Sequence, residues 1–141
     1  MLSAASHPLL LGYRGVRSMP LSGARPADLP AENTIAAFDY ALANGCDGFE
    51  FDVRCTRDGR SVICHDPEFN GREISTTDYA DLGRDGSRPP CLEDALARFG
   101  RVAYLDIELK LTGNEELVIG RFAPILPRAG LCCHPSFPTC C

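Results

Sequence analysis

The 141-residue sequence contains no apolar run long enough to cross a bilayer and no cluster of Lys or Arg. Because the net charge is −5, the missing basic cluster argues against a nonspecific nucleic-acid binder. The apolar patch at residues 8–11 has no basic segment before it, so no signal peptide is expected. A chain of this length and composition can form one domain with a buried core.

The sequence also lacks the cysteine spacing of a disulfide scaffold, although it has eight cysteines. Four of them crowd residues 132–141 around His134. The other four cysteines are scattered along the chain, a distribution that fits a reducing, cytoplasmic compartment. Those four stand singly among apolar residues and are predicted to be small buried side chains: Cys46, Cys55, Cys64 and Cys91.

Apolar periodicity predicts an α/β architecture in which strands and helices alternate. Residues 32–45 have the pattern of an amphipathic helix, capped by Asn33 or Thr34 and ended by Gly45. Residues 67–90, broken by several glycines, are expected to form a loop. The other expected elements are strands at residues 9–13, 48–55, 61–65 and 102–110 and short helices at residues 92–99 and 115–121.

The Asp-Gly pair at residues 58–59 is a tight-turn signal and predicts a hairpin between the second and third strands. With this pair at the centre of the turn, Asp52 lies opposite His65. Glu50 then lies opposite Pro67, so His65 comes to the end of the strands that carries the two carboxylates. Because the longer strand-helix rhythm implies a parallel sheet, this hairpin is expected to be a local irregularity.

Glu50 and Asp52 are separated by one residue on a predicted strand. Successive strand residues point to opposite faces, so the two carboxylates share one face and Phe49, Phe51 and Val53 occupy the other. Two readings are open from this pair alone. The acids either line a solvated strand face or bind a hard cation such as Mg²⁺ or Ca²⁺, which prefers carboxylate oxygens.

Six short motifs between residues 9 and 110 resemble, in order, those of the glycerophosphodiester phosphodiesterase family. They are Gly12-Tyr13-Arg14-Gly15, Pro30-Ala31-Glu32-Asn33-Thr34, Glu50-Phe51-Asp52, Thr56-Arg57-Asp58-Gly59, His65-Asp66 and Glu108-Leu109-Lys110. The resemblance implies a (β/α)8 TIM-barrel phosphodiesterase fold. Such a barrel needs about 250 residues, so residues 1–120 are interpreted as an N-terminal half, truncated after about four strands. The open edges of the first and fourth strands would favour self-association.

The resemblance also implies the roles of individual residues. A phosphodiester is anionic, so attack at phosphorus needs cationic groups around its oxygens, and a histidine can transfer a proton near neutral pH. A cation held by three carboxylates keeps positions open for water and substrate. The implied metal ligands for one Mg²⁺ or Ca²⁺ are Glu50, Asp52 and Glu108; the implied phosphate-binding residues are Arg14 and Lys110; the implied acid/base is His65.

Each of these residues also has a purely structural reading. Taken without the other motifs, Arg14 and Lys110 are interpreted as surface cations. Glu108 could simply pair with Lys110. The His65-Asp66 pair before Pro67 could be a turn. Capping of the following helix is the favoured reading of residues 32–33.

Tyr13 departs from the family pattern, which carries a second catalytic histidine at this position. A phenol with an ordinary pKa of about 10 is a poor base at neutral pH. The implied reaction is metal-dependent hydrolysis of a small-molecule glycerophosphodiester to glycerol 3-phosphate and an alcohol, impaired by Tyr13 and by truncation. One alternative is a non-catalytic fragment or pseudoenzyme with a residual metal site. Another is a related barrel phospholipase that cyclises its product.

Residues 121–141 look foreign to the rest of the chain. Cys and His are preferred zinc ligands, although adjacent Cys-Cys pairs are not the usual ligand spacing. Alternatively, residues 132–141 are translated out of frame, since dropping two bases permits Leu-Ser-Ser-Phe-Leu-Pro-Asp-Val-Leu. That segment resembles the Ser-Ser-Phe of the family's next strand, and the DNA of the locus would decide between the hypotheses.

Overall fold

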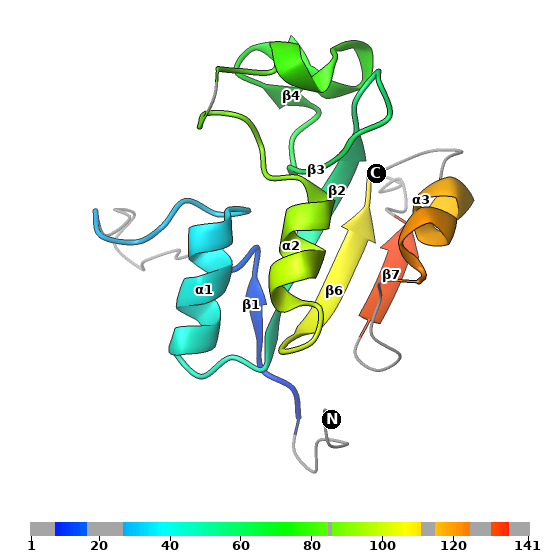
Figure 1. Ribbon diagram of the computed structural model, residues 1–141. Helices are drawn as coiled ribbons and strands as arrows, with labels where there is room; N and C mark the ends of the chain where they lie inside the picture. The colour runs from blue at the N-terminus through cyan, green and yellow to red at the C-terminus, as the bar shows by residue number, and fades with distance from the viewer. Residues whose placement is uncertain (1–7, 17–26, 85, 111–114, 125–130, 136–141) are drawn as a thin grey trace, which may run out of the picture.

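The computed structural model describes residues 8–16, 27–84, 86–110, 115–124 and 131–135. Its centre is a sheet of parallel strands in the order β1 (Leu11–Tyr13), β2 (Gly48–Cys55), β6 (Tyr104–Leu109) and β7 (Leu131–Pro135). One face of this sheet is covered by α1 (Ile35–Ala43), α2 (Leu92–Phe99) and α3 (Glu115–Phe122) (Figure 1). The predicted α/β architecture is therefore confirmed.

The two faces of the sheet differ because side chains alternate along β2 and β6. Under the helices lies an aromatic core in which the rings of Phe38 and Phe49 stack with their centroids 4.2 Å apart. Phe99 meets Phe49 edge-on, with ring centroids 5.1 Å apart. The opposite face carries the acids of the same two strands: Glu50, Asp52, Asp106 and Glu108.

Helix α1 is shorter than the predicted residues 32–45. Thr34 is its N-cap, and the Thr34 Oγ1 atom accepts a hydrogen bond of 3.1 Å from the backbone N–H of Ala37. Asn33 stands just before the cap in the left-handed region, with φ of +56°. Asparagine tolerates this conformation better than most residues. Residues 32–33 thus lie outside the helix and are available for another role.

The predicted hairpin between β2 and β3 (Ser61–Ile63) exists, but its predicted register is wrong by one residue. Val53 pairs with Ile63, and the backbone N–H of Cys64 donates to the carbonyl of Asp52, so Asp52 lies opposite Cys64 and not His65. The turn has three residues, 57–59, because the N–H of Thr56 already bonds the carbonyl of Arg60. A three-residue turn closed by a left-handed glycine is a common alternative to the two-residue turn.

The predicted loop at residues 67–90 is a small folded unit. It contains the two-stranded ladder of β4 (Glu68–Phe69) and β5 (Arg72–Glu73), and two short 3₁₀ turns follow at Ile74–Thr76 and Tyr79–Asp81. This unit stands beyond the carboxyl end of β2 (Figure 1). Its own small core consists of Val62, Ile74 and Leu82, with Cys64, Phe69 and Tyr79 packed against them.

Two further predictions need correction. Of the four scattered cysteines, which are all free thiols, only Cys91 is buried, because Cys55 and Cys64 border surface pockets and Cys46 lies in the turn before β2. The strand at residues 102–110, observed as β6, is not an edge, since β7 pairs with it. Residues 136–141 of the cysteine-rich tail lie outside the described residues, so the zinc and frame hypotheses stay untested.

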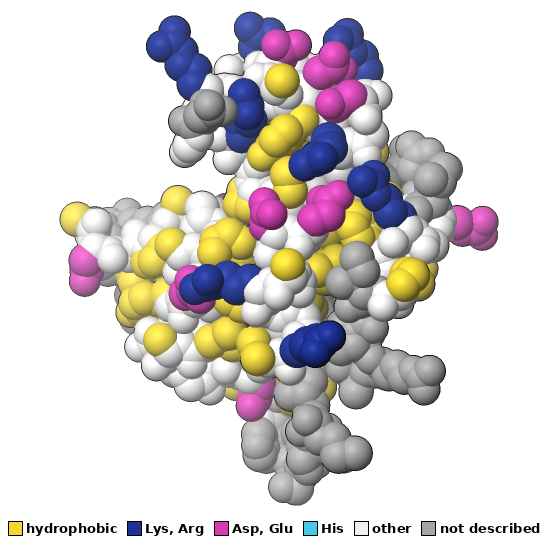
Figure 2. Space-filling view, in the orientation of Figure 1, with side chains coloured by type: hydrophobic (Ala, Val, Ile, Leu, Met, Phe, Trp, Pro, Cys, Tyr) yellow, Lys and Arg dark blue, Asp and Glu magenta, His cyan; other side chains and the backbone are white. Residues whose placement is uncertain are grey.

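On the helix-covered face, charges of both signs are mixed with apolar side chains and form no continuous basic surface (Figure 2). No helix within the described ranges has the length and hydropathy to cross a membrane.

Candidate active site

Three carboxylates from two neighbouring parallel strands converge on the uncovered face of the sheet. Glu50 and Asp52 belong to β2 and Glu108 belongs to β6, where it stands in register with Asp52. One carboxylate oxygen from each lies within 4.8 Å of those of the other two. The structure therefore brings together the three residues for which the sequence analysis expected a metal site.

Asp52 is the most deeply buried of the three, with 1% of its surface exposed. Its Oδ2 atom accepts a hydrogen bond of 3.3 Å from Asn33 Nδ2 and lies 3.3 Å from Arg14 Nε. Its Oδ1 atom makes no hydrogen bond, and Lys110 Nζ lies 3.4 Å away as an ion-pair partner. Because Lys110 contacts this oxygen only at ion-pair distance, Asp52 Oδ1 can also serve as a cation ligand.

Arg14 is buried in the site and is not the surface cation that it would be on the structural reading. Its backbone adopts a φ of +49°, followed by Gly15 at +76°, which turns the chain after β1. A side chain at Gly15 would collide with Ala37 and Phe38, so glycine is required where this turn meets α1. The turn directs the Arg14 N–H to Glu50 Oε2 at 3.2 Å and its guanidinium to Glu32 Oε1 at 2.9 Å.

Lys110 follows β6 and is likewise held inside the site. Its Nζ atom donates a hydrogen bond of 2.6 Å to Glu108 Oε1. Burial alone would lower the pKa of this ammonium, but its hydrogen bond to Glu108 and the charge of Asp52 outweigh burial and raise the pKa. Lys110 thus remains protonated beside the carboxylates.

The charge balance of the site fits a hard divalent cation. Burial in the first place, and then the neighbouring negative charges, raise the pKa of Glu50 from 4.5 to about 7. Oxygen-only donors are what Mg²⁺ and Ca²⁺ prefer. Among the described residues in and around the cluster, the carboxylates outnumber the cations Arg14 and Lys110; they are those of Glu32, Glu50, Asp52, Asp106 and Glu108.

This raised pKa predicts a pH-dependent stability for the metal-free chain. The folded form keeps the Glu50 proton that the unfolded form releases, so the unfolding free energy should fall as pH rises from about 4.5 to about 7. Urea unfolding across this range measures the slope. Glu50→Gln removes the titrating group and should flatten it, and added Ca²⁺ should offset the loss at neutral pH. An equal slope in the wild-type and Glu50→Gln chains would contradict the assignment.

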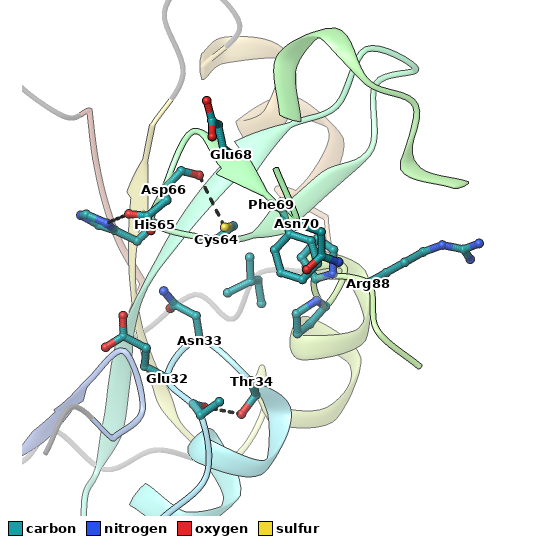
Figure 3. Close-up of a pocket in the computed structure, with 14 residues that line it drawn as sticks. Glu32, Asn33, Thr34, Cys64, His65, Asp66, Glu68, Phe69, Asn70 and Arg88 are labelled. Atoms are coloured by element: carbon teal, nitrogen blue, oxygen red, sulfur yellow. Dashed lines mark hydrogen bonds and ion pairs between the residues drawn. The ribbon is translucent and has the colours of Figure 1, made fainter. Parts of the chain in front are cut away.

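His65 lies on the loop after β3, at the rim of the site. Arg54 anchors its backbone by donating to the His65 carbonyl oxygen from Nη2 at 2.6 Å and from Nε at 2.9 Å. The imidazole Nδ1 lies 2.8 Å from Asp66 Oδ1, which orients the ring, and 39% of the side chain is exposed. Figure 3 shows His65 and Asp66 above Glu32 and Asn33. The catalytic role implied for His65 stays a prediction.

Tyr13 ends β1 in register with Glu50. Its ring lies against the Arg14 guanidinium at 5.0 Å, and its hydroxyl accepts a hydrogen bond of 3.2 Å from Arg14 Nη2. Tyr13, at the position where a catalytic histidine was expected from the sequence, thus lies beside the site residues Glu50 and Arg14, although its side chain is half exposed.

Three residues of this site were not assigned to it from the sequence: Glu32, Asn33 and Asp106. The capping interpretation of residues 32–33 is wrong, because Glu32 pairs with Arg14 and Asn33 donates to Asp52. Their presence in one of the six motifs was the signal that could have placed them. Asp106 stands in register with Glu50, which only strand pairing reveals.

Parallel strands with helices on one face and an acidic cluster on the other are the arrangement of part of an α/β barrel. A model of the glycerophosphoryl diester phosphodiesterase family matches residues 21–117. The chain belongs to this family.

Relatives and solved structures agree with this assignment. A probable glycerophosphodiester phosphodiesterase 1 of Mycobacterium tuberculosis is 48% identical over 62 residues, which cover 44% of this chain and 19% of the relative. The uncharacterized protein YqiK of Bacillus subtilis is 34% identical over 110 residues, covering 62% and 45%.

The crystal structure of a glycerophosphodiester phosphodiesterase from Thermotoga maritima aligns with a TM-score of 0.71 at 24% identity. One from Parabacteroides distasonis aligns with a TM-score of 0.64 at 26% identity. The alignments cover 93% and 74% of this chain but only 55% and 50% of those structures. The chain therefore has the fold of part of a (β/α)8 barrel and spans about half the length of these structures.

Proposed function

We propose that this chain carries the site of a metal-dependent hydrolase that converts glycerophosphodiesters to glycerol 3-phosphate and an alcohol. The observation that carries the proposal is the convergence of Glu50, Asp52 and Glu108 within 4.8 Å, flanked by Arg14 and Lys110. Family membership supports the choice of ester. We place the reaction in a reducing, cytoplasmic compartment, which the free thiols of the described cysteines support.

The three carboxylates would hold one Mg²⁺ or Ca²⁺. Such a cation, when bound, neutralises charge on the phosphate oxygens. Arg14 and Lys110 would bind the same phosphate group, since both already lie at the carboxylates and are kept charged there. His65 would transfer a proton, with Asp66 holding its Nδ1 side so that Nε2 is free to act. Tyr13 would serve as a weak acid for the leaving alkoxide.

Turnover of glycerophosphodiesters by the purified chain tests this proposal. Release of glycerol 3-phosphate should require Mg²⁺ or Ca²⁺, should stop on chelation, and should be lost in Glu50→Gln. The matched control is Glu116→Gln, an exposed glutamate on α3, which should retain wild-type turnover. Activity that survives both chelation and Glu50→Gln would rule out the proposed site.

A second candidate is a pseudoenzyme that binds a divalent cation but does not hydrolyse the ester. The contacts of Tyr13 favour this candidate. The Tyr13 hydroxyl and ring both contact Arg14, and a tyrosine supplies no imidazole at this position. Calcium-dependent stabilisation without release of glycerol 3-phosphate would distinguish this candidate. Self-association through the edge strand β1 is a further proposal, and light scattering of the purified chain tests it.

A further inference from the structure

A pocket of about 410 Å³ opens beside the carboxylate cluster. One side of it is the loop before α1, with Glu32 and Asn33, and the other side is the start of the small folded unit, from Cys64 to Asn70 (Figure 3). Glu32 and Asn33 connect it directly to the site, since they contact Arg14 and Asp52 respectively. A diester whose phosphate lies at Arg14 would therefore extend one of its alcohol groups into this pocket.

The walls of the pocket combine an apolar surface with negative charge. Ile63, Phe69, Pro89 and Pro90 supply the apolar part. Three carboxylates line it as well: Glu32 is already paired with Arg14, whereas Asp66, beside His65 Nδ1, and the exposed Glu68 form its acidic rim. The Arg88 side chain points away from the pocket in Figure 3, and its guanidinium donates to the carbonyls of Gly83 and Ala80. An aromatic and apolar wall with an acidic rim suits an organic cation.

Asn33 gives the pocket a polar group of its own. The residue is 7% exposed and holds a left-handed backbone conformation. Its Nδ2 atom is used by Asp52, whereas its Oδ1 atom is buried and has no hydrogen-bond partner. Figure 3 shows the side chain directed from the loop toward Cys64 and Asp66. A buried acceptor without a donor is rare in folded proteins, and a ligand N–H would satisfy it.

We propose that this pocket binds the leaving alcohol of the diester and selects an alcohol that carries a primary ammonium group, with Asn33 Oδ1 as its acceptor. The inference rests on the proposed function and adds the substrate class. A primary ammonium has the positive charge that the acidic rim attracts. It also has N–H groups that can donate a hydrogen bond to the unpaired Asn33 Oδ1 atom. A trimethylammonium group has the charge alone, and a neutral polyol has only hydroxyl donors.

Three diesters separate these features: glycerophosphoethanolamine, glycerophosphocholine and glycerophosphoglycerol. With Mg²⁺ or Ca²⁺ present, kcat/KM for the ethanolamine diester should exceed that for the choline diester by about tenfold or more, as for a hydrogen bond to a charged group. Asn33→Gly keeps the left-handed backbone, removes the amide and should bring this ratio close to one. Asn33→Gly also removes the hydrogen bond from Asn33 to Asp52, but this loss affects all three diesters alike. The ratio of the two kcat/KM values therefore reports on the Asn33 Oδ1 atom.

The charge of the rim is tested at Glu68, which is exposed and outside the catalytic cluster. Glu68→Gln should lower kcat/KM for both cationic diesters relative to glycerophosphoglycerol by about two- to fivefold, as expected for one exposed charge. Glu73→Gln is the matched control, since Glu73 pairs opposite Glu68 on the same ladder but does not line the pocket. Its ratios should equal those of the wild type.

Equal kcat/KM for the ethanolamine and choline diesters, or a ratio unchanged in Asn33→Gly, overturns the assignment of the pocket and leaves the proposed hydrolysis standing. If no diester is hydrolysed, the proposed function fails and the pocket is judged by calorimetric binding of the same three diesters to the Ca²⁺-supplemented chain. Tighter binding of the ethanolamine diester, lost in Asn33→Gly, supports the pocket. Equal or absent binding overturns it.

Discussion

Replacing Tyr13 by histidine is expected to raise the turnover of glycerophosphodiesters by about 10²–10⁴-fold, the range that one general acid/base contributes. The position lies at the end of β1, in register with Glu50 and in contact with Arg14, so a new imidazole would enter the site without a change of backbone. An imidazole both gives and takes a proton near neutral pH, whereas a phenol can give one to a leaving alkoxide but is a poor base. The initial rate of glycerol 3-phosphate release, with saturating Mg²⁺ or Ca²⁺, measures the effect.

Two variants control this experiment. Tyr40→His places a histidine at another partly exposed tyrosine, on α1, and should leave turnover unchanged. Tyr13→Phe keeps the ring and removes the hydroxyl, so a fall in turnover would show that the phenol donates a proton in the wild type. No gain in Tyr13→His would mean that Tyr13 is not at the catalytic position or that a different defect disables the enzyme.

Replacing Asp52 by alanine should destabilise the metal-free chain by about 3 kcal/mol, the lower end of the range for breaking a buried ion pair. Asp52 is almost fully buried and pairs with both Arg14 and Lys110, which would lose a partner inside the protein. The loss of unfolding free energy stays at the lower end of this range because each cation retains another ion-pair partner. Arg14 still pairs with Glu32, and Lys110 still pairs with Glu108. Urea unfolding measures the change.

The matched control is Asp39→Ala, which breaks an exposed aspartate-arginine pair with Arg98. That loss should be below about 1 kcal/mol, as for surface ion pairs. Asp52→Asn keeps the hydrogen bond from Asn33 but loses the charge. Calcium should therefore stabilise the wild type and Asp39→Ala but neither variant of Asp52. Equal destabilisation by Asp39→Ala and Asp52→Ala would refute the importance of the buried contacts.

The strands and helices that bury one full face were predictable from sequence. Both β2 and α2 have the bounds that alternation and helical spacing indicated. In β2, the phenylalanines on one face and the acids on the other identified both the core and the cluster. Residues 67–90 were missed as a folded unit because Ile74 and Leu82 pack with Val62 of β3 in a small core assembled from distant positions without a local period.

The register of the β2–β3 hairpin shows the limit of a local signal. An Asp-Gly pair fits both a two-residue and a three-residue turn, and the two differ by one residue in pairing. The choice depends on contacts outside the turn. The Asp58 carboxylate accepts from the Thr56 hydroxyl at 2.6 Å and from the distant N–H of Tyr79 at 3.0 Å.

The sequence by itself determined the family and predicted both the carboxylates that would bind a metal and a departure from the family pattern at Tyr13, because motif order and strand alternation are properties of the chain. Only the tertiary structure decided that Arg14 and Lys110 are ion-pair partners of the cluster, that residues 32–33 belong to the site, and that a pocket adjoins it. These facts depend on the left-handed turns at Arg14 and Asn33 and on the pairing of β1, β2 and β6, which bring residues distant in sequence within hydrogen-bond distance.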